Sequence, residues 1–249
     1  MKVAPVDPRM RFPARICFGL ILCMAVGSLH AATSSRGQDI RRIRHSERVF
    51  RSIMKTPDHA IPESILGKAK CIAIIPGQKK FAFGFGGQYG KGLATCRTTR
   101  LGWSAPLFIQ IGGASWGLQI GGASSDVIMV FMSRAGLRKM LSSKFKIGAG
   151  AMAAAGPVGR NVSAATNITL KSKILTYARS SGAFAGISLN GSVIQPDNSG
   201  NRHMYGHSLS DRRILSGHVR VPPAAVPLIR LIETDTHYIR AGAPVPRRH

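Results

Sequence analysis

The sequence predicts an α+β protein whose core is a strongly curved, Gly-rich antiparallel β-sheet or barrel. Three observations lead to this prediction. Short runs of β-forming residues alternate with glycine from residue 71 to about residue 195. Segments on both sides of this region have helical periodicity instead, which predicts an N-terminal amphipathic helix and a few short flanking helices. Finally, glycine within strands favours bends, bulges and close backbone approaches, which a curved sheet requires.

A doubled motif, QIGGAS, begins at Gln110 and again at Gln119. We expect the two copies to be neighbouring strand segments that each turn a corner. A phosphate-cradling loop is the alternative, but the chain has neither GxxxxGK[ST] nor a GxGxxG between a clear strand and a helix. The glycines expected in strands are Gly84, Gly86, Gly87, Gly112, Gly113, Gly121 and Gly122.

The remaining elements follow from the same periodicities. Ser133 is expected to cap a helix that begins at residue 134, and Pro62 and Pro222–Pro223 precede two further helical segments. Asn190–Gly191 fits a two-residue hairpin turn. The expected strands are 71–75, 81–89, 107–111, 127–132, 161–170, 173–180, 183–189 and 192–195.

Residues 1–32 have the three parts of a secretory signal. Basic residues precede the apolar run 16–27, and the small residues Ala31 and Ala32 follow it. Cleavage after one of these alanines would place the protein beyond the inner membrane, in the periplasm or at the periphery of the envelope. In that compartment Cys71 and Cys96 form either a disulfide or two buried thiols, and the sequence leaves both possibilities open.

Three regions follow the signal: a basic amphipathic helix within 33–58, a domain over 59–235 and a flexible basic tail over 236–249. On a helical projection of 39–55, Arg42 alone among the arginines falls on the apolar side. The apolar side either inserts shallowly into a lipid surface or packs on the sheet. The basic side carries Arg41, Arg44, Arg48, Arg51 and Lys55, and the apolar side carries Ile43, Val49, Phe50, Ile53 and Met54.

Charge is the outlying property of the composition. Lys and Arg total 35 against 10 Asp and Glu, a formal net charge of +25. Such a surface favours an anionic partner, either a lipid layer, nucleic acid or another polyanion, although a basic protein without a dedicated partner is the alternative. Lys68, Lys70, Lys79 and Lys80 are expected to extend the lipid-binding basic surface.

Catalytic chemistry is not predicted. No pair of carboxylates is suitably placed, and His203 and His207 are expected in a surface loop rather than at a metal site. PDNSGN, residues 196–201, is expected to be a polar loop. We therefore predict no enzyme, no metal and no cofactor; an enzyme whose site forms only in three dimensions is the weaker alternative.

Seven collinear stretches stand out in the middle of the chain: AKCIAIIPG (69–77), FGFGGQYGKG (83–92), SAPLFIQIGGASWGLQIGG (104–122), DVIMVFM (126–132), AAGPVGR (154–160), ILTYARSSGAFAGISLNG (174–191) and NRHMYG (201–206). In these stretches the chain resembles the SYLF domain family, also called the Las-seventeen-binding actin-regulator family. The resemblance covers most of 60–235.

Membership implies a lipid-binding module. Eukaryotic members bind phosphoinositide membranes through an amphipathic N-terminal helix and basic residues, and some bind actin filaments, which we do not expect of a secreted protein. The family often has acids where this chain has Gly150, Asn167 and Asn190. Together these observations predict a non-enzymatic protein that binds anionic membrane surfaces. The alternative is a polyanion-binding or partner-binding structural protein of the bacterial envelope.

Overall fold

The computed structural model describes residues 15–56, 60–99, 102–141, 153–155, 174–180, 183–184 and 192–236. Several sequence-based expectations therefore lie outside the described residues. They are the strand at 161–170, the turn at 190–191, nearly all of the basic tail and the positions Gly150, Asn167 and Asn190.

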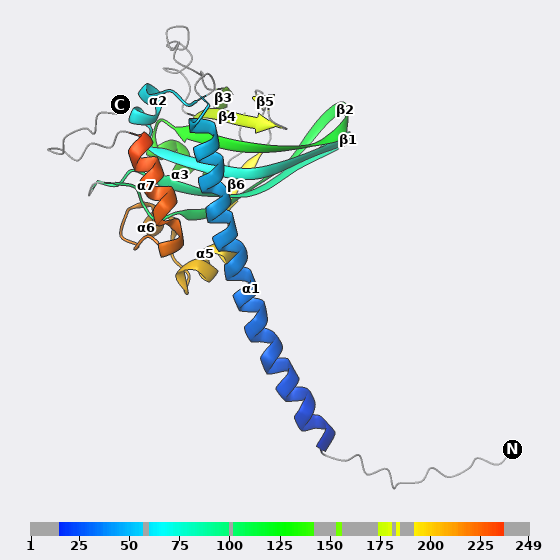
Figure 1. The fold of residues 1–249 in the computed structure, drawn as a ribbon. Helices are drawn as coiled ribbons and strands as arrows, with labels where there is room; N and C mark the ends of the chain where they lie inside the picture. The colour runs from blue at the N-terminus through cyan, green and yellow to red at the C-terminus, as the bar shows by residue number, and fades with distance from the viewer. Residues whose placement is uncertain are drawn as a thin grey trace.

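The N-terminal helix α1 is longer than the sequence predicts. It spans Arg15–Met54, and the expected basic segment forms its C-terminal part. This part lies along the strands, while the N-terminal part of α1 extends away from them (Figure 1). Within the described residues no helix combines the length and the apolar character needed to cross a membrane.

Two long antiparallel strands dominate the sheet. β1 spans Cys71–Cys96 and β2 spans Leu107–Phe131, paired from Cys71 opposite Phe131 to Ala94 opposite Leu107. The sequence predicts four separate strands over this region, and that prediction is wrong. Both copies of QIGGAS lie one after the other in β2 rather than on neighbouring strands. The physical reason lies in the backbone angles, because a chain reversal favours a glycine with positive φ. Within the described parts of the two strands, β2 has no such glycine and β1 has only Gly77.

β1 nevertheless bends back on itself. A straight strand of this length would span about 85 Å, yet the Cα atoms of its terminal residues Cys71 and Cys96 are 4.0 Å apart. The early part of the strand lies directly against the later part at Gly90 and Gly92. A Cβ on Gly90 would lie 2.7 Å from Ile75 Cγ2, and a Cβ on Gly92 would lie 2.2 Å from the Ile74 carbonyl oxygen. Glycine is therefore required where the strand approaches itself.

Four shorter strands complete a six-stranded sheet. β4, Ile174–Ser180, pairs antiparallel with β2, and β5, Ala183–Phe184, pairs antiparallel with β4. β3, Ala153–Ala155, pairs parallel with β4, the single parallel pairing among the described strands. β6, Val193–Pro196, pairs with β2. The predicted α+β class with a curved, largely antiparallel sheet is confirmed.

Short helices surround the sheet. They are α2 (Glu63–Lys68), α3 (Arg134–Leu141), α5 (Asn198–Tyr205), α6 (Asp211–Leu215), the 3₁₀ turn η2 (Pro223–Ala225) and α7 (Val226–Asp235). The predicted cap of α3 is present, since Ser133 Oγ accepts from the Gly136 amide at 3.1 Å. The expected loop at 196–201 and the expected loop position of His203 are wrong, because Asp197 caps α5 and Gly206 ends it with φ +79°, while His207 lies beyond the helix. Asp197 and Gly206 are thus the start and stop signals of a helix.

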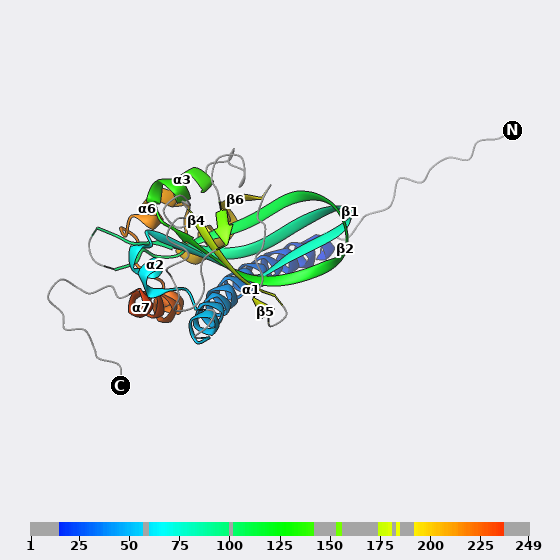
Figure 2. The same cartoon turned by 90° about the horizontal axis from the view of Figure 1, so that it is seen from above.

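Alternate residues of the strands contribute to two hydrophobic clusters. One cluster contains Val127 and Met129 and is joined by α3 and α6. The other contains Ile128 and Val130 and is joined by α1, α2 and α7. Figure 2 shows α3 and α6 on one side of the strands, and α7 with the C-terminal part of α1 on the other side. The molecule therefore has two faces with different helical covers.

A basic cleft beside the N-terminal helix

The apolar side of α1 packs on the strands. Ile43, Phe50 and Ile53 are completely buried and Val49 is 3% exposed, while Met54 is half-buried at the edge of the same cluster. Their neighbours include Ile72, Ile74 and Val130. The sequence left insertion and packing open for this side, and the structure places it in the core.

The opposite side of α1 presents the five cations predicted from the sequence. Arg41, Arg44, Arg48, Arg51 and Lys55 are all exposed. Arg51 forms an ion pair with Glu47 one helical turn earlier, with 2.6 Å between Nη2 and Oε1. The other four have no acidic partner within the described part of the chain. Most of the predicted positive stripe is therefore uncompensated.

An open cleft of about 470 Å³ lies beside this stripe. Pro76 and Lys91 of β1 form the wall opposite the helix. No carboxylate belongs to the lining, so an anion entering the cleft meets mainly basic side chains. The residues that α1 contributes are Gln38, Arg41, Arg42, Arg44, His45 and Arg48.

Buried Asp197 holds two walls of the cleft together. Its Oδ2 lies 2.9 Å from Arg42 Nη1 and 3.0 Å from Lys91 Nζ, so it links α1 to β1 and to the start of α5. Arg42 also pairs with Asp39 at 3.0 Å and lies over the Phe108 ring, 5.1 Å from its centroid. The arginine that interrupts the apolar pattern thus has a structural role.

The network changes the acidity of Asp197. Burial alone raises its pKa, but hydrogen bonds from Lys91, Ser199, the Gly200 amide and Arg42 outweigh that effect and lower the pKa to about 2. Asp197 is therefore ionised throughout the neutral range. Its charge is matched by Arg42 and Lys91, which leaves Arg41, Arg44 and Arg48 as the unpaired cations of the lining.

The four lysines predicted to extend the basic surface are not part of the cleft lining. Lys68 ends α2 and Lys70 precedes β1, and both are exposed. Lys79 is exposed and Lys80 half-buried, both on β1. These lysines remain a prediction as lipid contacts.

Sequence reasoning missed Lys91 and Asp197 as parts of the site. An isolated lysine among glycines carries no periodic signal, and Asp197 was interpreted as part of a polar loop. The available signal was Arg42, because an arginine on an apolar helix face requires a buried acidic partner.

The two histidines of HMYGH lie at the end of α5. His203 lies on α5, where its Nδ1 is 3.2 Å from Asp39 Oδ2, and His207 is exposed beyond the end of that helix. In the described parts of the chain no three His, Cys, Asp or Glu side chains come together as metal ligands would.

Comparisons with known proteins place the fold in a family. A sequence model described as "Ysc84: Las17-binding protein actin regulator" matches residues 112–235. "Protein YSC84" of Saccharomyces cerevisiae is 34% identical over 210 residues, 83% of this chain and 44% of the relative.

Two further relatives agree with this match. "SH3 domain-containing protein PJ696.02" of Schizosaccharomyces pombe is 34% identical over 73% of this chain and 43% of its own length. "SH3 domain-containing YSC84-like protein 1" of Mus musculus is 32% identical over 72% of this chain and 53% of its own length. The chain thus spans about half of these relatives or less. On the match to the family model and the identity to these relatives, the chain belongs to the SYLF, or Las17-binding actin-regulator, family.

Proposed function

We propose that the protein binds anionic lipid surfaces without catalysis, through the basic cleft and the exposed stripe of α1. The observation that carries this proposal is the group Arg41, Arg44 and Arg48, which line one open cleft that contains no carboxylate. Each basic residue near an anionic bilayer contributes about 1 kcal/mol. The docked apolar side of α1 supports surface contact through charge rather than through insertion of the helix.

The cleft suits a phosphate-bearing headgroup. Arginine donates hydrogen bonds in a fixed planar fork that matches phosphate oxygens. Pro76 and Lys91 close one side of the cleft, so a headgroup in it has protein on two sides. The cations of the α1 stripe that do not line the cleft would face the bilayer. Secretion to a bacterial envelope remains part of this proposal and rests on the character of residues 1–32.

Las17 binding and actin regulation are properties stated in the names of the family and its relatives. The chain covers 44% of Protein YSC84, so these properties are not assigned to this chain.

Vesicle co-sedimentation tests the proposal. The protein is mixed with neutral vesicles and with vesicles containing about 30% anionic lipid, at low salt and at about 0.5 M salt, where surface charge is screened. We expect binding to the anionic vesicles alone, lost at high salt. Replacing Arg41, Arg44 and Arg48 by Gln removes about 3 kcal/mol, an affinity loss of about a hundredfold.

A second variant controls for net charge. Arg213, Arg220 and Arg230 are also exposed but line no part of the cleft, and their replacement by Gln removes the same charge. This variant should bind vesicles within about threefold of the parent, because exposed charges outside the cleft are screened by salt and do not contact the headgroup. Equal losses in both variants, or equal binding to neutral vesicles, would contradict a site on α1. Binding to a soluble polyanion but to no vesicle would favour the polyanion alternative.

A further inference from the structure

A second pocket lies on the other side of the strands, away from α1. It has a volume of about 400 Å³ and is formed by the end of β1, by α3 and by α6 with its flanks. Its leucines belong to the cluster shared with α3 and α6, whereas α1 belongs to the other cluster. The pocket is therefore independent of the basic cleft.

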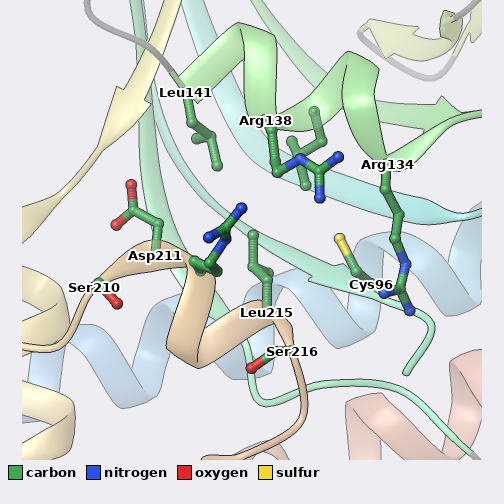
Figure 3. Close-up of a pocket in the computed structure, with 10 residues that line it drawn as sticks. Cys96, Arg134, Arg138, Leu141, Ser210, Asp211, Leu215 and Ser216 are labelled. Carbon is green, nitrogen blue, oxygen red and sulfur yellow. The ribbon is translucent and has the colours of Figure 1, made fainter. Parts of the chain in front are cut away.

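The floor of the pocket is apolar. Leu137, Leu141 and Leu215 line it together with the disulfide-bonded Cys96 (Figure 3). All four belong to one hydrophobic cluster, with 1%, 9%, 8% and 4% of their surface exposed. Because these side chains are already more than 90% buried, an apolar chain laid on them would gain mainly van der Waals contacts with the floor and bury its own hydrocarbon surface.

The rim of the pocket is cationic. Arg134 and Arg138 project from α3, and Arg212 is contributed by α6. None of the three forms an ion pair within the described residues. Figure 3 shows Arg134 near Cys96 at one end and Asp211 beside Leu141 at the other. Asp211 is the one acid of the lining, and burial raises the pKa of its carboxyl.

We infer that this pocket binds a single-chain anionic amphiphile, a long-chain carboxylate, with its tail on the leucines and its carboxylate at the arginines. The volume lies in the roughly 300–1,000 Å³ range of small-molecule sites. A small hydrophilic anion would make no use of the apolar floor, and a neutral apolar ligand would leave the arginines without a partner. Arginine also forms two parallel hydrogen bonds with a carboxylate. The inference goes beyond the proposed function, since no residue of this pocket belongs to the basic cleft.

Calorimetric titration with dodecanoate below its micelle concentration tests the inference. Two further probes separate the contribution of the tail from that of the charge. Dodecanol has the tail without the charge, and hexanoate has the charge with a short tail. We expect saturable binding of dodecanoate at one site, and at least tenfold weaker binding of each of the other two. Equal affinity for dodecanol and dodecanoate would overturn the inference, as would non-saturable uptake.

Variants locate the site. Changing Arg134, Arg138 and Arg212 to Gln should weaken dodecanoate binding at least tenfold and leave vesicle binding within about threefold. The Arg213, Arg220 and Arg230 variant removes equal charge outside the pocket and should keep dodecanoate affinity. The single change Arg138→Gln, at an exposed position, serves if the triple variant does not fold by circular dichroism.

The lipid-surface proposal and the pocket inference can be tested independently of each other. The Arg41, Arg44 and Arg48 variant should bind dodecanoate as the parent does, even where it no longer binds vesicles. A folded Arg134, Arg138 and Arg212 variant with unchanged dodecanoate affinity would sink the inference. A third outcome would also overturn the inference: the parent does not bind dodecanoate, and the Arg134, Arg138 and Arg212 variant loses vesicle binding. The surface around the second pocket would then be a contact with the bilayer.

Discussion

At the scale of single residues, Asp197 connects three parts of the chain that are distant in sequence. It accepts from Arg42 on α1 and from Lys91 on β1, and it caps α5 through the Gly200 amide. Three elements thus meet at one buried carboxylate. A buried charge is stable only when it is paired. Removing any one member of this network therefore leaves an uncompensated buried charge on the remaining members.

The pH dependence of stability follows from this network. The pKa of Asp197 is about 2 in the folded protein against 3.8 ordinarily, so its contribution is complete above pH 4 and is lost as the pH falls toward 2. That difference corresponds to about 2 kcal/mol of unfolding free energy. Urea denaturation between pH 5 and pH 2 should show this decline.

Asp197→Asn tests the assignment. The amide keeps the helix cap but removes the charge, so we expect a loss of about 2–4 kcal/mol at pH 7. The variant should also lose less stability than the parent between pH 4 and pH 2. An unchanged pH profile would show that another carboxyl controls the acid range.

At the scale of elements, β1 depends on two glycines that the sequence analysis did not single out. Gly90 and Gly92 lie where β1 meets its own first half, with no room for a side chain. In the doubled motif, by contrast, a Cβ on Gly112 would lie 4.0 Å from its nearest neighbour and one on Gly122 would lie 3.9 Å away. The repeat that attracts attention in the sequence is thus less constrained at these positions than Gly90 and Gly92.

Two substitutions compare these positions. Gly92→Ala would place a methyl group 2.2 Å from the Ile74 carbonyl oxygen, and we expect it to lower unfolding free energy by about 3 kcal/mol or more. Gly112→Ala meets no atom closer than 4.0 Å and should cost less than about 0.5 kcal/mol. Denaturant titration measures both, and similar losses would refute the self-contact of β1.

At the scale of the whole molecule, a disulfide joins the two ends of the bent strand. Cys71 and Cys96 are bonded, both are buried, and they are separated by 25 residues. The same bond lies beneath the second pocket, since Cys96 contributes to its floor. The disulfide therefore stabilises both the sheet and the proposed amphiphile site.

Removing this cross-link should have a defined cost. For a loop of this length the chain-entropy model gives about 3.5 kcal/mol, which we expect for the double change Cys71→Ala and Cys96→Ala relative to the oxidised parent. The parent under strong reductant should approach the stability of this variant. A parent that keeps its full stability after complete reduction, verified by thiol titration, would contradict this role.

The sequence by itself determined the elements that have local signals. α1 had a basic and an apolar side, α3 had Ser133 as its cap, and the Gly-rich centre predicted a curved sheet. Each of these features depends on the periodicity of a segment or on a neighbouring residue, and both can be read directly from the sequence. The collinear motifs also identified the family.

The tertiary structure decided what depends on residues distant in the chain. The merging of the predicted strands into β1 and β2 and the pairing of Cys71 with Cys96 leave no local signal. Arg42 indicated a buried acidic partner, but only the folded chain identifies Asp197 and Lys91 as the groups that meet it. Each arises when burial removes water from groups that the fold brings together, so that only complementary partners remain stable there. The basic stripe was therefore predictable from helical periodicity, whereas the cleft beside it required the folded chain.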